Sequence, residues 1–141
     1  MTDRLRTELA LLTLRVGIGA FMAVWASLKF YRPGWMVNVF TKTYGLEWVT
    51  QDMAFAVGSI QIIIVIAFIT GFLRTWSYGM VLAMHATGVI GSLSSLMNFT
   101  RFPNNLLWTS VATLTALIAL FLLRNQDNLL SIDGWRKKKS P

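Results

Sequence analysis

The chain has 141 residues, of which 55% are hydrophobic and only 13% are charged. A typical soluble domain is about 45–50% apolar and about 25% charged, so this composition argues against a water-soluble fold and indicates that lipid surrounds most apolar side chains. The net charge of +7 does not predict nucleic-acid binding, because the Lys and Arg residues lie in short connectors and at the termini. The absence of cysteine excludes disulfides and thiolate-ligated iron–sulfur clusters.

Four stretches are long enough to cross a bilayer and carry almost no charge. An α-helix needs about 20 apolar residues to cross roughly 30 Å of hydrocarbon at about 1.5 Å per residue. The predicted spans are residues 9–28, 53–73, 76–97 and 104–123, and their one charged residue is Arg15. The sequence therefore predicts an all-α fold, an integral membrane four-helix bundle, as a single domain.

The first span has an alternative interpretation as a cleaved signal peptide. Arg15 interrupts its apolar core, and no small-x-small cleavage site follows it. These two features favour a retained helix.

The connection between the first and second spans contains a further apolar pattern. Trp35, Met36, Val39 and Phe40 share one face of a helix at this spacing. We therefore predict a short amphipathic helix over residues 34–44 that lies in the outer interface with its aromatic side chains at headgroup depth. The same helix is alternatively a cap on the bundle.

The distribution of Lys and Arg predicts the orientation. Nine of the 13 lie on the side of the termini: Arg4, Arg6, Arg15, Arg74, Arg124, Arg136, Lys137, Lys138 and Lys139. The other four are Lys29, Arg32, Lys42 and Arg101. Because cytoplasmic segments are enriched in Lys and Arg, both termini are predicted to be cytoplasmic, and the basic tail, residues 134–141, is predicted to contact anionic headgroups.

Polar side chains inside a bilayer are costly, so each one is a candidate for function. Arg15 lies near the start of the first span, where its guanidinium either snorkels to the cytoplasmic headgroups or binds an anion or a buried helix C-terminus. Gln61 lies near the middle of the second span. Its amide either bonds to a neighbouring helix or orients a ligand carbonyl such as that of a quinone.

His85 is the only histidine and shares one face of the third span with Tyr78 and Ser92. Its imidazole is either a hydrogen-bonded packing residue or a donor to a quinone oxygen. One histidine without a cysteine or an intramembrane carboxylate predicts no metal site, and no nucleophile–base pair predicts catalytic residues. The candidate ligand-binding residues are His85, Gln61, Arg15, Tyr78 and Ser92.

Lys29 and Arg32 follow the first span on the outer side. They either anchor the helix end by snorkelling or form an electropositive rim for an anion that enters from outside. Small residues at four-residue spacing, such as Gly19 and Ala23, allow helix backbones to approach closely within the chain or between copies.

Three groups of residues carry a family resemblance. They are Arg15-Val16-Gly17-Ile18-Gly19 with Lys29-Phe30 and Pro33, then Gly58, Gln61, Gly71 and Arg74, and finally Asn128 to Asp133. Together they resemble the DoxX family of small bacterial membrane proteins over roughly residues 11–133. The resemblance implies a four-helix bundle in the bacterial inner membrane and a link to quinone, because named relatives include the small subunit of thiosulfate:quinone oxidoreductase. Gln61 departs from the pattern, since relatives commonly carry Glu there, and this puts a proton-coupled role in doubt.

Three functions are compatible with these features. The first is a subunit or accessory of a quinone-linked redox system that binds quinone or a partner within the bundle. The second is a structural or assembly subunit without its own ligand, and the third is a small-solute or lipid transporter that acts as an oligomer. The expected partners are the lipid bilayer and either a larger membrane complex or further copies of the chain, and enzymatic activity stays open.

Overall fold

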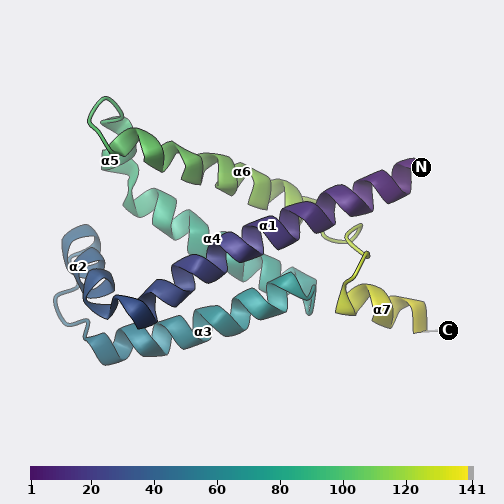
Figure 1. Ribbon diagram of the computed structural model, residues 1–141, viewed down its shortest axis with the longest axis horizontal. Helices are drawn as coiled ribbons and strands as arrows, with labels where there is room; N and C mark the ends of the chain where they lie inside the picture. Colours follow the sequence, from purple (N-terminus) through teal and green to yellow (C-terminus); the bar gives the residue numbers. More distant parts are fainter. Residues whose placement is uncertain (140–141) are drawn as a thin grey trace.

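The structure, a computed structural model, describes residues 1–139, and this part of the chain is helical without strands. In chain order the helices are α1 (Asp3–Tyr31), α2 (Pro33–Tyr44), α3 (Gln51–Ile69), α4 (Arg74–Gly91), α5 (Leu93–Met97), the 3-10 helix η1 (Asn104–Leu107), α6 (Trp108–Leu122) and α7 (Ile132–Lys139) (Figure 1). The predicted all-α fold is confirmed.

Local chemistry explains where several helices begin and end. The Thr2 hydroxyl caps the start of α1 by accepting a hydrogen bond from the Leu5 amide at 3.4 Å. Thr50 caps α3 in the same way through the Met53 amide. Gly45, with φ +67°, ends α2 in the left-handed conformation that glycine adopts without a steric penalty.

Three helices are long and apolar enough to cross a membrane, judged by length and composition. They are α1, α3 and the continuous helical stretch of η1 and α6. The fourth long helix, α4, is not among them, since it contains Arg74 and His85 together with several Gly, Ser and Thr residues. A bilayer crossing by α4 therefore has to be argued from its packing.

Two helix ends differ from the predicted spans. The second span was predicted to reach residue 73, but α3 ends at Ile69 because Gly71 turns the chain with φ +62°. The third was predicted as one helix over 76–97, whereas α4 ends at Gly91 and the short α5 continues after Ser92. Glycine and serine are weak helix formers, which explains why a break falls here.

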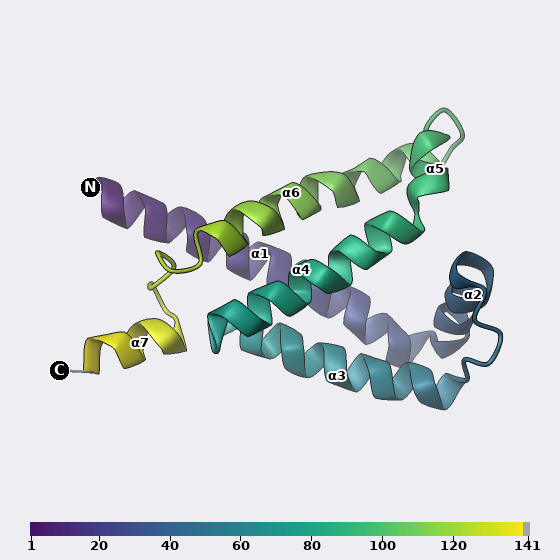
Figure 2. The same cartoon turned by 180° about the vertical axis from the view of Figure 1, so that it is seen from behind.

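The four longest helices pack in a ring, α1 against α3, α3 against α4, α4 against α6 and α6 against α1. Successive members run in opposite directions (Figures 1 and 2). Their buried side chains form one hydrophobic core: Leu11, Ile18, Met22, Val65, Phe68, Tyr78, Val81, Leu117 and Leu120. Gly19 lets α3 approach α1, since a Cβ at this position would lie 2.3 Å from Cγ1 of Ile69.

The molecule has two distinct ends. The terminal end carries both chain termini, the turn between α3 and α4, and α7, while the α2 end carries α2, α5 and η1 (Figures 1 and 2). At the α2 end, α2 packs on α1 and α3, and the Tyr44 hydroxyl donates to the Thr87 carbonyl of α4 at 3.3 Å. Thus α2 links both sides of the ring.

The outward faces of the helices are apolar. On α3, Ile60, Ile63 and Ile66 are 58%, 68% and 56% exposed. Side chains of this size normally favour an apolar environment, by about 1.5–3 kcal/mol each when fully buried. The exposed surface is therefore suited to contact with lipid or with another apolar protein surface.

Replacing Gly19 by Ala is expected to loosen the contact between α1 and α3. The added Cβ would lie 2.3 Å from Cγ1 and 2.9 Å from Cδ1 of Ile69, so we expect a loss of about 1–3 kcal/mol in the free energy of unfolding in detergent. Gly17→Ala is the matched control, because a Cβ there meets nothing within 4 Å. Equal losses in the two variants would contradict the close contact at Gly19.

Candidate functional site

A buried ion pair lies at the terminal end, between α1 and the segment that connects α6 to α7. We call this segment, residues 123–131, the C-terminal strap. Nη1 of Arg15 is 3.2 Å from Oδ2 of Asp127, and neither side chain is exposed. The Tyr78 hydroxyl of α4 donates to the same carboxylate oxygen at 2.7 Å. The pair thus joins α1, α4 and the strap.

Arg15 makes three further hydrogen bonds: Nη1 donates to the Tyr78 hydroxyl of α4 at 3.4 Å, and the other two go to the strap. Nη2 donates to the carbonyl oxygens of Leu129 at 2.8 Å and Leu130 at 3.0 Å. Within residues 1–139, Nε of Arg15 and Oδ1 of Asp127 are buried without a hydrogen-bond partner. The guanidinium therefore binds one carboxylate and two backbone carbonyls, which compensates for most of the water that it loses.

A second pair, Arg74 and Asp133, extends the network toward α7. Nη1 of Arg74 donates to the Arg124 carbonyl at 2.9 Å and to the Asp127 carbonyl at 2.5 Å. The Asp133 carboxylate accepts from the amides of Leu73 and Arg74 at 3.2 and 2.9 Å, so it caps the start of α4 from a distant part of the chain.

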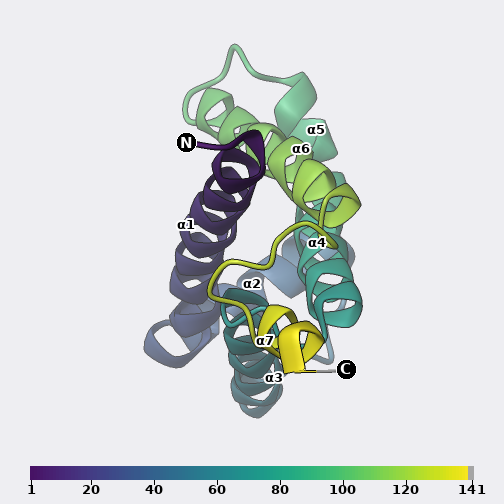
Figure 3. The same ribbon diagram turned by 90° about the vertical axis from the view of Figure 1, so that its right-hand side faces the viewer.

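The first two residues of α7, which follow the strap directly, bond to the turn between α3 and α4. The amides of Ile132 and Asp133 donate to the carbonyls of Thr70 and Gly71 at 3.0 and 3.2 Å. A Cβ on Gly71 would lie 2.5 Å from Cβ of Ser131, so glycine is needed here both for its positive φ and for this close approach. Figure 3 shows the strap crossing the end of the long helices.

Arg15 does not take the first of its two predicted alternatives, snorkelling to the cytoplasmic headgroups. Its side chain is completely buried and turns to Asp127, which lies 112 residues later and outside the predicted spans. The sequence signal that identifies the partner is Asp127 itself, the first carboxylate after the last span.

The structure divides the predicted ligand-binding set into two groups. Tyr78 belongs to the Arg15 network, whereas His85 lies two turns further along α4, about 10 Å by helical rise. Nε2 of His85 is 2.8 Å from the Ser110 carbonyl of α6, and the ring meets Phe21 of α1 edge-on with centroids 5.8 Å apart. His85, at 9% exposure, thus joins three helices as a packing residue.

Gln61 and Ser92 make no side-chain hydrogen bond within residues 1–139. Gln61 shares the inward face of α3 with the buried residues Gly58 and Val65, but it remains half-buried. Ser92 is half-buried at the break between α4 and α5. Neither residue belongs to the Arg15 network.

Lys29 and Arg32 do not form the predicted joint rim. Lys29 is buried, and its ammonium donates back to the Trp25 carbonyl of the same helix at 3.2 Å. Arg32 is exposed at the junction of α1 and α2. The two side chains differ because position 29 lies on the inward face of α1, next to Gly58 of α3.

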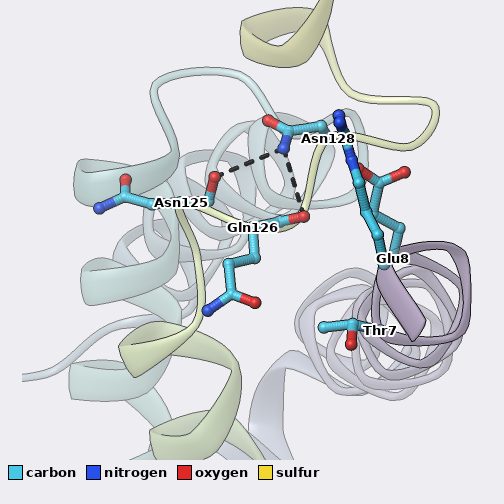
Figure 4. A pocket seen from close by; sticks show the side chains of 6 residues that line it. Thr7, Glu8, Asn125, Gln126 and Asn128 are labelled. Carbon is cyan, nitrogen blue, oxygen red and sulfur yellow. Dashed lines mark hydrogen bonds and ion pairs between the residues drawn. The ribbon is translucent and has the colours of Figure 1, made fainter. Parts of the chain in front are cut away.

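Two surface cavities lie at the terminal end. One, of about 280 Å³, is lined by Arg4, Thr7, Glu8, Asn125, Gln126 and Asn128, and Figure 4 shows α1 and the strap on its two sides. The other, of about 290 Å³, is lined by Arg74, Thr75, Asn125, Asp133, Arg136 and Lys137. Neither cavity reaches His85 or Gln61, and no cluster of three metal-ligating side chains occurs among the described residues.

Comparison of the chain with protein-family models, curated proteins and solved structures returned no match. The resemblance to the DoxX family therefore stays a prediction from the motifs.

Replacing Asp127 by Ala is expected to destabilise the protein strongly, because it leaves the Arg15 guanidinium buried without a counter-charge. We expect a loss of about 3–5 kcal/mol in the free energy of unfolding in detergent. The exposed Asp52, in the first turn of α3, gives the matched control Asp52→Ala, with an expected loss below about 1 kcal/mol.

The double variant Arg15→Met/Asp127→Leu tests the cause of that loss. Because it removes both charges and fills the space with apolar atoms, it is expected to recover most of the stability that Asp127→Ala loses. A single variant that unfolds like Asp52→Ala would show that the ion pair does not hold the strap.

Proposed function

We propose that this chain is an integral membrane protein whose four long helices cross the bilayer as a bundle. Three of these helices have the necessary length and hydropathy, and the exposed isoleucines of α3 support contact with lipid. For α4, the support comes from packing: Arg74, Tyr78 and His85 are buried against other helices, so its outward face is left with residues such as Trp76 and Met80.

In this proposal the terminal end faces the cytoplasm and α2 lies in the opposite interface. The excess of Lys and Arg at the terminal end supports this orientation. The exposed aromatic residues Trp35, Trp48 and Phe102 at the α2 end are typical of a headgroup region.

The function that the geometry supports best is that of a structural or assembly subunit of a larger membrane complex. One observation carries this proposal: the charged side chains buried among the helices are bonded within the chain itself. Arg15 pairs with Asp127, Arg74 pairs with Asp133, and Lys29 bonds to a carbonyl of its own helix. Because these buried groups bond within the chain and stabilise the fold, we expect partner proteins to bind to the outer surface of the helices.

A second candidate, a quinone-binding accessory subunit, is favoured by one specific feature. The Gln61 amide lies half-buried on the inward face of α3 and has no hydrogen-bond partner within residues 1–139. An amide in that position is suited to donate to a quinone carbonyl. The motifs that resemble the DoxX family support the same candidate by analogy alone.

The membrane topology is testable by single-cysteine labelling, because the chain contains no cysteine. We expect Thr43→Cys and Arg101→Cys, at the α2 end, to react with an impermeant maleimide from outside intact cells. Thr2→Cys and Lys137→Cys are expected to react only after the membrane is opened. All four positions are exposed, so labelling of both pairs from the same side would contradict the proposed crossing.

The two candidate functions are separated by the double variant Gln61→Leu/His85→Phe. For an assembly subunit, we expect this variant to co-purify with the same membrane proteins as the wild type and neither form to retain quinone. The readouts are the co-purified proteins and the extracted quinone per chain. Gln51→Leu, at the exposed start of α3, is the control. Quinone that is retained by the wild type and by Gln51→Leu but lost from the double variant would instead support the second candidate.

A further inference from the structure

A cation-rich cavity lies where α7 meets the starting turn of α4. Its lining includes Arg136 and Lys137 from α7, Thr75 from α4 and Asn125 from the strap. Arg124 of the strap adjoins it, since Nε of Arg124 bonds to the Thr75 hydroxyl at 3.3 Å. Cations from two separate elements therefore surround one cavity of about 290 Å³.

The cavity has an excess of positive charge. Its one carboxylate, Asp133, already pairs with Arg74 and accepts from two backbone amides. Within residues 1–139, no carboxylate pairs with Arg124, Arg136 or Lys137. The Thr75 hydroxyl and the Asn125 amide add neutral polar groups, so the cavity suits an anion with several oxygen atoms, such as a phosphate.

Large apolar side chains are exposed on the two helices that line this charged cavity. Trp76, next to the lining residue Thr75 on α4, and Trp135, next to Arg136 on α7, are 74% and 68% exposed. A site for a soluble phosphate needs no such apolar surroundings. A phosphate that is attached to acyl chains does, because the chains can lie along the outward faces of α4 and α6.

We infer that this cavity binds the phosphate-bearing headgroup of an anionic phospholipid from the cytoplasmic leaflet. The inference rests on the proposed membrane crossing and orientation. The headgroup contacts Arg136 and Lys137, and its acyl chains extend along α4. Because α7 and α4 are already joined through Asp133, a lipid bound in this cavity would also hold the strap against the helix ends.

The inference is tested with the full chain in nanodiscs of equal parts phosphatidylglycerol and phosphatidylcholine. The lipids that remain bound after release into mild detergent are counted by native mass spectrometry. We expect the wild type to retain phosphatidylglycerol in preference to phosphatidylcholine. In the double variant Arg136→Gln/Lys137→Gln, the ratio of bound phosphatidylglycerol to bound phosphatidylcholine is expected to fall by about fivefold or more per removed charge. Added salt is expected to weaken the binding of phosphatidylglycerol to the wild type.

The matched control is Arg4→Gln/Arg6→Gln, which removes two charges at the same end of the molecule. Both arginines are exposed and already paired, Arg4 with Glu8 and Arg6 with Asp3. The control is expected to keep the preference for phosphatidylglycerol. An equal loss in both double variants, or no preference in the wild type, would overturn the inference.

Two further arms separate the sources of failure. Water-soluble glycerophosphoglycerol should not displace the bound lipid at comparable concentration, and displacement would overturn the inference in favour of a site for a soluble phosphate. Flotation with vesicles of phosphatidylcholine alone tests membrane insertion without any anionic lipid. A chain that floats with these vesicles but shows no lipid preference refutes the lipid site, whereas a chain that does not float refutes the proposed membrane crossing.

Discussion

The buried ion pair of Arg15 and Asp127 joins the first helix to the segment that follows the last long one, and the other polar contacts at the terminal end are arranged around it. Two charges without exposure are stable only where further hydrogen bonds replace the lost water. The Tyr78 hydroxyl and the carbonyls of Leu129 and Leu130 supply these bonds. Breaking the pair from one side would leave an uncompensated charge, so α1, α4 and the strap depend on one another. The ion pair therefore holds α1 and the strap together at the terminal end of the molecule.

The same constraint explains the unusual composition of α4. This helix, unlike α1, α3 and the stretch of η1 and α6, is not apolar enough to cross a membrane by composition, yet its side chains Arg74, Tyr78 and His85 are buried. Arg74 and Tyr78 both bond to Asp127 of the strap, through its carbonyl and its carboxylate, and His85 bonds to the Ser110 carbonyl of α6. A helix whose most polar side chains face its neighbours presents a mainly apolar outer face even when its average hydropathy is modest; on α4 the exposed Thr75 and Thr87 are the smaller polar groups. The modest hydropathy of α4 is therefore compatible with the proposed membrane crossing.

The division of polar groups along the molecule bears on function. At the terminal end the buried charges bond to one another, and the surface around them is basic and rich in exposed tryptophan. In the middle, His85 bonds to Ser110, while the Gln61 amide remains without a partner in residues 1–139. Stability and the proposed quinone binding thus involve different residues. A change at Gln61 can alter binding without loosening the strap, which makes the two proposed functions separable by experiment.

The sequence by itself determined the all-helical fold, the apolar stretches and the additional helix after the first span, because these follow from local periodicity and side-chain hydropathy. Only the tertiary structure decided that Arg15 pairs with Asp127, that Asp133 caps α4, and that Lys29 turns inward toward Gly58. These contacts join residues that lie far apart in the chain, 112 positions for the ion pair. No local pattern encodes such a pairing, since it depends on which helix ends the packing brings together.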